Sequence, residues 1–175
     1  MNELSKKIIA CAVAVAVLGL VYYGSYLPYK KSRIFIETMA GLGKVGGLEN
    51  FQDALAVPLD QFSPVGQEEL VRNTASTIFT VINNQGSDAE VTRQLIDFIQ
   101  SYYDPIIAKG RGIAFHQNLL LLGSLHQTAF VRTGNIEYFN NAKDLFKRGL
   151  ETSPGRPQFL YALFNLARAE SDIGA

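Results

Sequence analysis

The sequence has a single cysteine, Cys11, and only two histidines, His116 and His126. One thiol cannot form a disulfide within the chain, and it excludes a zinc site built from several thiolates. Two histidines leave little material for a histidine-based metal centre. We therefore expect no disulfide framework, no bound metal and no other cofactor.

A surplus of basic residues is also missing. The chain holds 16 lysines and arginines against 16 aspartates and glutamates. Residues 30–175 alone carry 14 basic and 15 acidic residues, which leaves that part with a net charge of −1 when histidine is neutral. Proteins that hold nucleic acid electrostatically concentrate positive charge on one face. We therefore expect no nucleic-acid partner.

Charge is absent altogether from residues 8–29, IIACAVAVAVLGLVYYGSYLPY. As a helix this run would extend about 33 Å, against a bilayer hydrocarbon core of about 30 Å. Three tyrosines gather at its distal end, as the aromatic belt of a membrane interface would. The sequence predicts an N-terminal transmembrane helix, which makes the lipid bilayer a partner; the resemblance described below implies that this is a bacterial cytoplasmic membrane. The tyrosines are Tyr22, Tyr23 and Tyr26, and the flanking basic residues are Lys6, Lys7, Lys30, Lys31 and Arg33.

Two other interpretations of this run are a cleaved signal peptide and a lipoprotein signal. A signal peptide needs small residues before its cleavage site, but a cut after Gly24 or Ser25 would put a tyrosine where a small residue is required. Cuts among the alanines inside the run stay open. A lipoprotein cysteine follows the apolar segment, whereas Cys11 opens it, so we set that alternative aside. The flanking charges are too evenly divided to give the orientation of the helix by the positive-inside rule.

Beyond Pro28, apolar residues recur at helical spacing and no alternating strand is found, so the sequence predicts an all-α body. The last three helices are expected at 113–132, 136–151 and 157–173. We divide the chain into 1–29, the N-terminal flank and transmembrane helix; 30–62, juxtamembrane helices and a glycine-rich joint; 63–112, one or more helix pairs; and 113–175, a repeat followed by the start of a second.

Prolines and capping residues predict where the earlier helices begin and end. Pro58 should stop a short helix, and Ser63-Pro64 should start the next one, with serine as the cap and proline in the first turn. That helix should end at residues 83–86, and Ser87 to Glu90 form a capping box for its successor. Asp104-Pro105 should close this successor, because proline removes a helical hydrogen bond.

One helical repeat can be recognised near the C-terminal end. Its small residues would let two helices approach closely, while Phe146 fills the space between them and a proline ends the pair. The pattern resembles a tetratricopeptide repeat, and the resemblance implies an array of antiparallel helix pairs. The residues that carry it are Leu119, Leu122, Gly123 and His126 in the first helix, and Ala142, Phe146, Gly149 and Pro154 in and after the second.

The resemblance has departures. Leu119 and His126 replace the usual tryptophan and tyrosine, and the stretch from Gly123 to Ala142 is about two helical turns longer than in the family pattern. A further first helix follows Pro154. The given sequence ends where the second helix of that repeat would start, which suggests a fragment of a longer reading frame; the alternative is a complete chain capped by its last helix. The apolar stripe of that first helix comprises Phe159, Leu160, Leu163, Leu166 and Ala167.

A wider resemblance lies in the order of the segments: a hydrophobic span, the element Pro64-Val-Gly66-Gln-Glu68-Glu69, and then helical repeats. This order is similar to the C-terminal region of O-antigen ligase/polymerase-type membrane proteins that end in tetratricopeptide repeats. The resemblance implies a role in the transfer of lipid-linked glycans at the cell envelope. The catalytic parts of that family lie in membrane spans and an external loop that this sequence does not contain, so no catalytic residue is carried over.

The remaining motifs do not favour an enzyme. Residues 41–46 match a G-x-G-x-x-G pattern, but that pattern binds a nucleotide only between a strand and a helix, and here we expect a flexible joint. His116 and His126 would lie about 15 Å apart along one helix, so they could not share a metal, and His126 is interpreted as a packing residue between helices. The acidic pairs Glu68-Glu69 and Glu49/Asp53 are interpreted as solvated helix faces.

Two functions follow as hypotheses. The first is a membrane-anchored helical-repeat module that is not catalytic by itself and binds another protein or peptide on its repeat face. The alternative is the C-terminal tail of an O-antigen ligase/polymerase-type protein. A free-standing enzyme has no constellation of residues in its support.

Overall fold

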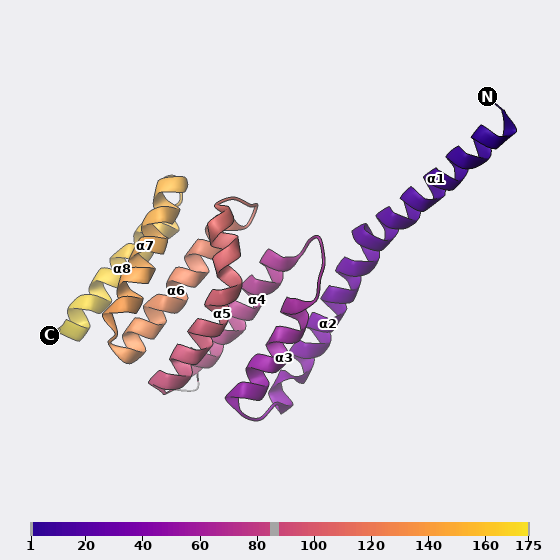
Figure 1. The fold of residues 1–175 in the computed structure, drawn as a ribbon. Coiled ribbons are helices and arrows are strands. Elements are labelled where there is room, and N and C mark those ends of the chain that lie inside the picture. The colour runs from indigo at the N-terminus through magenta and orange to yellow at the C-terminus, as the bar shows by residue number, and fades with distance from the viewer. Residues whose placement is uncertain (1, 85–87, 175) are drawn as a thin grey trace. The chain divides into compact units, whose positions relative to one another are not determined.

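The computed structural model describes residues 2–84 and 88–174. Every regular element in these ranges is a helix and none is a strand, which confirms the all-α prediction (Figure 1). The chain divides into two compact units, Met1–Gln67 and Glu68–Ala175. This boundary lies five residues beyond the one that the sequence suggested after residue 62.

The first unit begins with one long helical stretch. Helix α1 (Glu3–Val21) continues through a π-helical segment (Tyr22–Tyr26) into α2 (Leu27–Gly41), and a 3-10 turn (Leu42–Lys44) ends it. Pro28 follows the π-helical segment directly, so the widened turn precedes the proline that lacks an N–H, and the helical stretch continues past it. The 42-residue stretch is long and apolar enough to cross a membrane, and none of its most apolar window is buried.

Helix α3 (Leu48–Asp60) packs on α2 and completes the helices of the first unit. The prediction that Pro58 stops this helix is wrong, because α3 runs two residues further. Pro58 and Leu59 are both buried. The proline removes only one hydrogen bond in the last turn, and burial of the turn outweighs that loss.

Helix α4 (Gln67–Asn84) begins three residues after the predicted start at Ser63-Pro64, so that prediction is wrong. The Ser63 hydroxyl does not cap the helix; it donates to the carbonyl oxygen of Val65 at 2.8 Å. Such local bonds give serine an alternative to capping. Gly66 follows with φ of 90°, a left-handed conformation that separates the turn from α4.

The second unit continues with α5 (Ala89–Lys109), α6 (Phe115–Thr133), α7 (Ile136–Thr152) and α8 (Pro157–Gly174). The last three lie within two residues of their predicted bounds. Helix α6 packs on α5 and α7, and α8 packs on α6 and α7. The predicted stop at 83–86 and the capping box at 87–90 fall partly on residues 85–87, outside the described residues; α5 begins after Asp88.

Helix α5 passes straight through Pro105, so the predicted stop at Asp104-Pro105 is wrong. It ends instead at Gly110, which has φ of 67° and caps the helix in the left-handed conformation. Ile106 is buried, and the carbonyl oxygen of Ile107 accepts a hydrogen bond from Arg148 Nη2 at 2.9 Å. These contacts hold the last turn of α5 despite the lost hydrogen bond of the proline.

Candidate interaction surfaces of the helical unit

Among the described residues, the most extensive helix contact in the second unit joins α6 to α7. Phe146 and Ala142 of α7 are 0 % exposed, and Gly123 of α6 is buried. A Cβ placed on Gly123 would lie 2.4 Å from Cε1 of Phe146. No larger residue fits at Gly123 unless the ring moves. The other apolar members of the repeat pattern on α6, Leu119 and Leu122, are also fully buried.

A second contact of the same kind joins α7 to α8. A Cβ on Gly149 would lie 2.1 Å from Cε1 of Phe159, which is itself buried. Gly149 therefore meets the following helix, whereas the sequence pattern placed it in the contact with the preceding one. Pro154 is exposed in the turn between α7 and α8. The structure thus brings a glycine against an aromatic ring at two successive helix contacts.

His126 lies where α5, α6 and α7 meet. It is 4 % exposed, its Nε2 is 3.0 Å from Oε1 of Gln100 on α5, and its ring centroid is 5.8 Å from that of Tyr138 on α7. Its buried Nδ1 has no hydrogen-bond partner, so the geometry favours the tautomer in which Nε2–H donates to Gln100. Burial lowers the pKa of His126 to about 4. A neutral imidazole that connects three helices is a packing group at neutral pH.

His116 is on the same helix, and its ring lies edge-on to Phe115. In the described part of the chain, no three His, Cys, Asp or Glu side chains come close enough to hold a metal ion. The glycines of the 41–46 pattern lie at the end of α2 and in the 3-10 turn and loop that follow it, and a helix, not a strand, precedes them. This is not the strand–helix setting that nucleotide binding requires.

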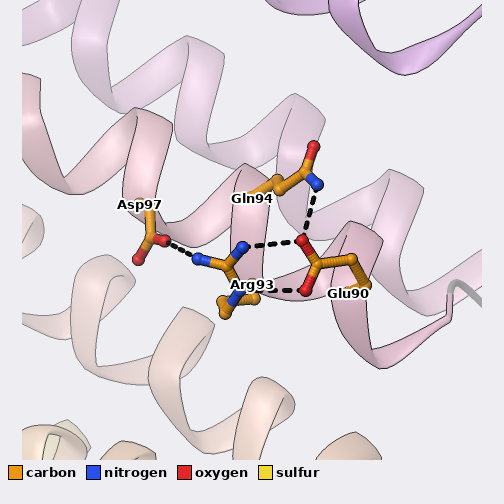
Figure 2. Close-up of polar contacts among 4 residues, drawn as sticks. All are labelled: Glu90, Arg93, Gln94 and Asp97. Carbon is orange, nitrogen blue, oxygen red and sulfur yellow. Dashed lines mark hydrogen bonds and ion pairs between the residues drawn. The ribbon is translucent and has the colours of Figure 1, made fainter.

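A hollow of about 650 Å³ lies between α5 and α7 and reaches His126. Its charged lining residues are Arg93, Asp97, Glu137, Asp144 and Arg148, of which Arg93 and Asp97 pair with each other. Arg93 binds Glu90 at 2.6 Å and Asp97 at 2.9 Å, and Gln94 donates to the same Glu90 (Figure 2). Hydrogen bonds from Arg93 and then Gln94 hold the pKa of Glu90 at about 2. On the α5 side of the hollow, Arg93 and Asp97 are therefore used within the chain, while Glu137 and Asp144 line the α7 side.

Two further hollows adjoin each other on the alternate helices α4, α6 and α8. The α4–α6 hollow has a volume of about 490 Å³ and the α6–α8 hollow about 320 Å³. Gln127 and Val131 of α6 line both. Arg132 donates to the carbonyl oxygen of Asn83 at 2.7 Å, which connects α6 to α4 at the end of this surface. The other residues of the two hollows are Phe79, Ser124, Thr128, Asn165, Arg168, Ala169 and Asp172.

One acidic pair differs from its predicted solvated state. The Glu68 side chain is only 26 % exposed, and its Oε1 is 3.0 Å from Nζ of Lys109 at the end of α5. Its carboxylate also lies against Gly112, where a Cβ would be 2.7 Å from Oε2. Glu68 thus connects the start of α4 to the end of α5. Glu69 instead pairs with Arg72 within its own helix. Glu49 and Asp53 are exposed, as expected.

Lys31 is one of the basic residues that flank the apolar run in the sequence, and its side chain is buried at 3 % exposure. Its partners are about thirty residues away in the chain and include two backbone carbonyls, so no local pattern indicates them. By contrast, the i, i+3 and i, i+4 spacing of Glu90, Arg93 and Asp97 does indicate their pairing.

Comparison with protein-family models, with curated proteins and with solved structures finds no match to this chain. Both resemblances noted in the sequence therefore rest on the residues of this chain alone.

Proposed function

We propose that this chain is a membrane-anchored helical-repeat module that binds a segment of another protein and has no catalytic activity of its own. The observation that carries the proposal is the surface formed by the two adjoining hollows on α4, α6 and α8. Gln127 and Val131 are common to both hollows. A segment lying along this surface would contact three helices in succession.

The order of helix contacts supports this assignment. Helix α6 packs between α5 and α7, and α8 returns to α6, so alternate helices share one face. Helical-repeat proteins bind peptides on such faces. The surface combines apolar groups, such as Val131, with amide side chains, such as Gln127, which suits a segment that has both apolar side chains and a polar backbone.

Membrane anchoring is the other half of the proposal. The N-terminal stretch exposes its apolar window completely, and only a bilayer or another apolar partner would remove that surface from water. We expect the full chain to stay in the membrane fraction through alkaline carbonate washing, because burial of about twenty apolar residues is effectively irreversible. A fragment of residues 68–175 should appear in the supernatant as the control. Recovery of the full-length chain in the supernatant would contradict anchoring, and a shortened N-terminus by mass spectrometry would indicate a cleaved signal.

The binding surface can be tested by photo-crosslinking in cells that make the protein. A crosslinking amino acid at Val131 should capture a specific protein, whereas one at Ile136 should not. The two positions are matched, because both carry β-branched residues that are 52 % and 57 % exposed, and Ile136 is outside both hollows. Equal capture from the two positions, or none from Val131, would count against the α4–α6–α8 surface.

A second candidate function is the C-terminal tail of an O-antigen ligase/polymerase-type protein. This candidate rests on the Pro64–Glu69 element of the sequence, in which Gly66 has a φ of 90° and Glu68 pairs with Lys109. Reading the genomic DNA upstream of Met1 tests this candidate. An in-frame extension that codes for many apolar spans would support it, and a stop codon with a ribosome-binding site would exclude it.

A further inference from the structure

Lys31 holds the segment between α3 and α4 against the long helix. Its Nζ donates to the carbonyl oxygen of Gln61 at 2.7 Å and lies 3.4 Å from that of Leu59, and it also contacts Oε1 of Gln67. These bonds attach both ends of residues 61–66 to α2. The 61–66 segment therefore has a defined place within the first unit, next to the long helix (Figure 1).

The tip of this segment lies beside the apolar part of the helix. Pro64 and Val65 form one wall of an apolar hollow of about 650 Å³. The opposite wall belongs to the long helix and extends from Ala16 to Gly24. Along the helix axis, Ala16 is about 20 Å and Gly24 about 7 Å from Tyr29. The tip is thus level with residues that belong to the expected membrane span. The rest of the opposite wall is made of Gly19, Leu20 and Tyr23.

The tip itself is apolar and uncovered. Residues 61–66 read QFSPVG and carry no charge. Phe62 is 64 % and Val65 60 % exposed, and the hydroxyl of Ser63 is used within the turn. Two large apolar side chains on a six-residue turn are an unfavourable surface in water, and they suit the boundary between headgroups and acyl chains.

We propose that the 61–66 segment is a second membrane contact, in which Phe62, Pro64 and Val65 enter the interfacial layer of the bilayer that the N-terminal helix crosses. The proposal rests on the proposed membrane anchoring. The occupant of the hollow is phospholipid, because its helical wall is continuous with the apolar surface of α1, none of which is buried. The exposed Lys30 lies on the adjoining turn of α2, where it meets headgroups.

This contact also defines where the membrane ends. A non-helical turn cannot enter the hydrocarbon region without leaving backbone groups unsatisfied, so the 61–66 segment marks the interface. The boundary then lies at the tyrosine-rich π-helical segment, Tyr22–Tyr26, and not at Tyr29. The uncharged residues from Ile8 to Tyr26 are left to cross the hydrocarbon, with Lys6 and Lys7 outside it. Their helical length of about 28 Å matches a core of about 30 Å.

Tryptophan fluorescence provides the test, because the chain has no tryptophan and a single indole reports one position. The full-length Val65→Trp variant is reconstituted into phosphatidylcholine vesicles whose acyl chains are brominated close to the headgroup. We expect its emission to fall about twofold relative to unbrominated vesicles, as for an interfacial indole. Ile36→Trp is the matched control. Ile36 is an exposed β-branched residue of the same unit, about 15 Å further along the helix from Tyr26, and its variant should keep its emission.

Flotation of the wild-type chain with the vesicles shows whether a negative result refutes the membrane anchor or only the second membrane contact. If the chain does not float, membrane anchoring itself is wrong and this inference is wrong with it. If the chain floats but the Val65→Trp variant is quenched no more than the Ile36→Trp variant, the anchor stands and the second contact is refuted. Phe62→Trp repeats the measurement at the other exposed side chain if circular dichroism shows that Val65→Trp disturbs the helices.

Discussion

Replacing Phe146 with alanine should lower the free energy of unfolding of the second unit by about 3–5 kcal/mol, the usual range for emptying a buried aromatic site. The ring is fully buried and lies directly on the backbone of Gly123, so no flexible side chain is available to fill the space. Urea unfolding of residues 68–175, followed by far-UV circular dichroism, measures the change. A loss below about 1 kcal/mol would contradict the close packing of α6 on α7.

Two matched variants sharpen this measurement. Phe164→Ala removes the same side chain from α8, where it is 66 % exposed, and should cost less than about 0.5 kcal/mol. Gly123→Ala should be destabilising alone but less so in the Phe146→Ala background, because the added methyl then enters the vacated space. The coupling between the two sites is read from the double-mutant cycle, and strict additivity would show that the residues do not touch.

Acidification from pH 6.5 to about 4 should cost the second unit about 3 kcal/mol through His126 alone. The folded-state pKa of His126 is lowered to about 4 from an ordinary value of 6.5, because burial disfavours the charged ring. As the pH falls through this window, the unfolded chain binds a proton that the folded chain does not. The stability is complete above pH 6.5, decreases towards pH 4 and changes no further below it.

Comparing the pH dependence of wild type and His126→Gln isolates this contribution, because the carboxylates titrate alike in both. The difference in free energy of unfolding between the two proteins should shrink or reverse towards pH 4. His116→Gln is the control and should keep the wild-type slope, since His126 remains. Of the groups that contact the ring, Gln100 does not titrate, and burial raises the pKa of Tyr138 above its ordinary value of 10.0. The carboxylates of Asp97, Glu137 and Asp144 line the same hollow and are present in both proteins. Parallel curves for wild type and His126→Gln would show that the imidazole is solvated.

Sequence reasoning located the helices of the second unit well where a local signal sets their ends. Asn135 is such a signal, because its side chain accepts from the amide of Glu137 at 2.9 Å and starts α7 at the predicted residue. The helix ends predicted at Pro58 and Pro105 are wrong. The cost of the missing N–H can be estimated from the local sequence, whereas the burial that offsets it depends on tertiary packing. The positions of Lys31 and Glu68 could not be predicted for the same reason. In the sequence both look like surface charges, because their partners are distant in the chain.

The two glycine–ring contacts lie close together on α7, with Phe146 directed at α6 and Gly149 receiving a ring from α8 only three residues later. A movement of α7 at one contact would change the space at the other. We therefore expect a substitution in the α6–α7 contact to affect the packing of α8 as well. In a linear array each pair of helices can in principle open by itself, but here neighbouring contacts share one short stretch of backbone. We therefore expect the last three helices to unfold together, and substitutions at Gly123, Phe146, Gly149 and Phe159 to be non-additive in their effect on stability.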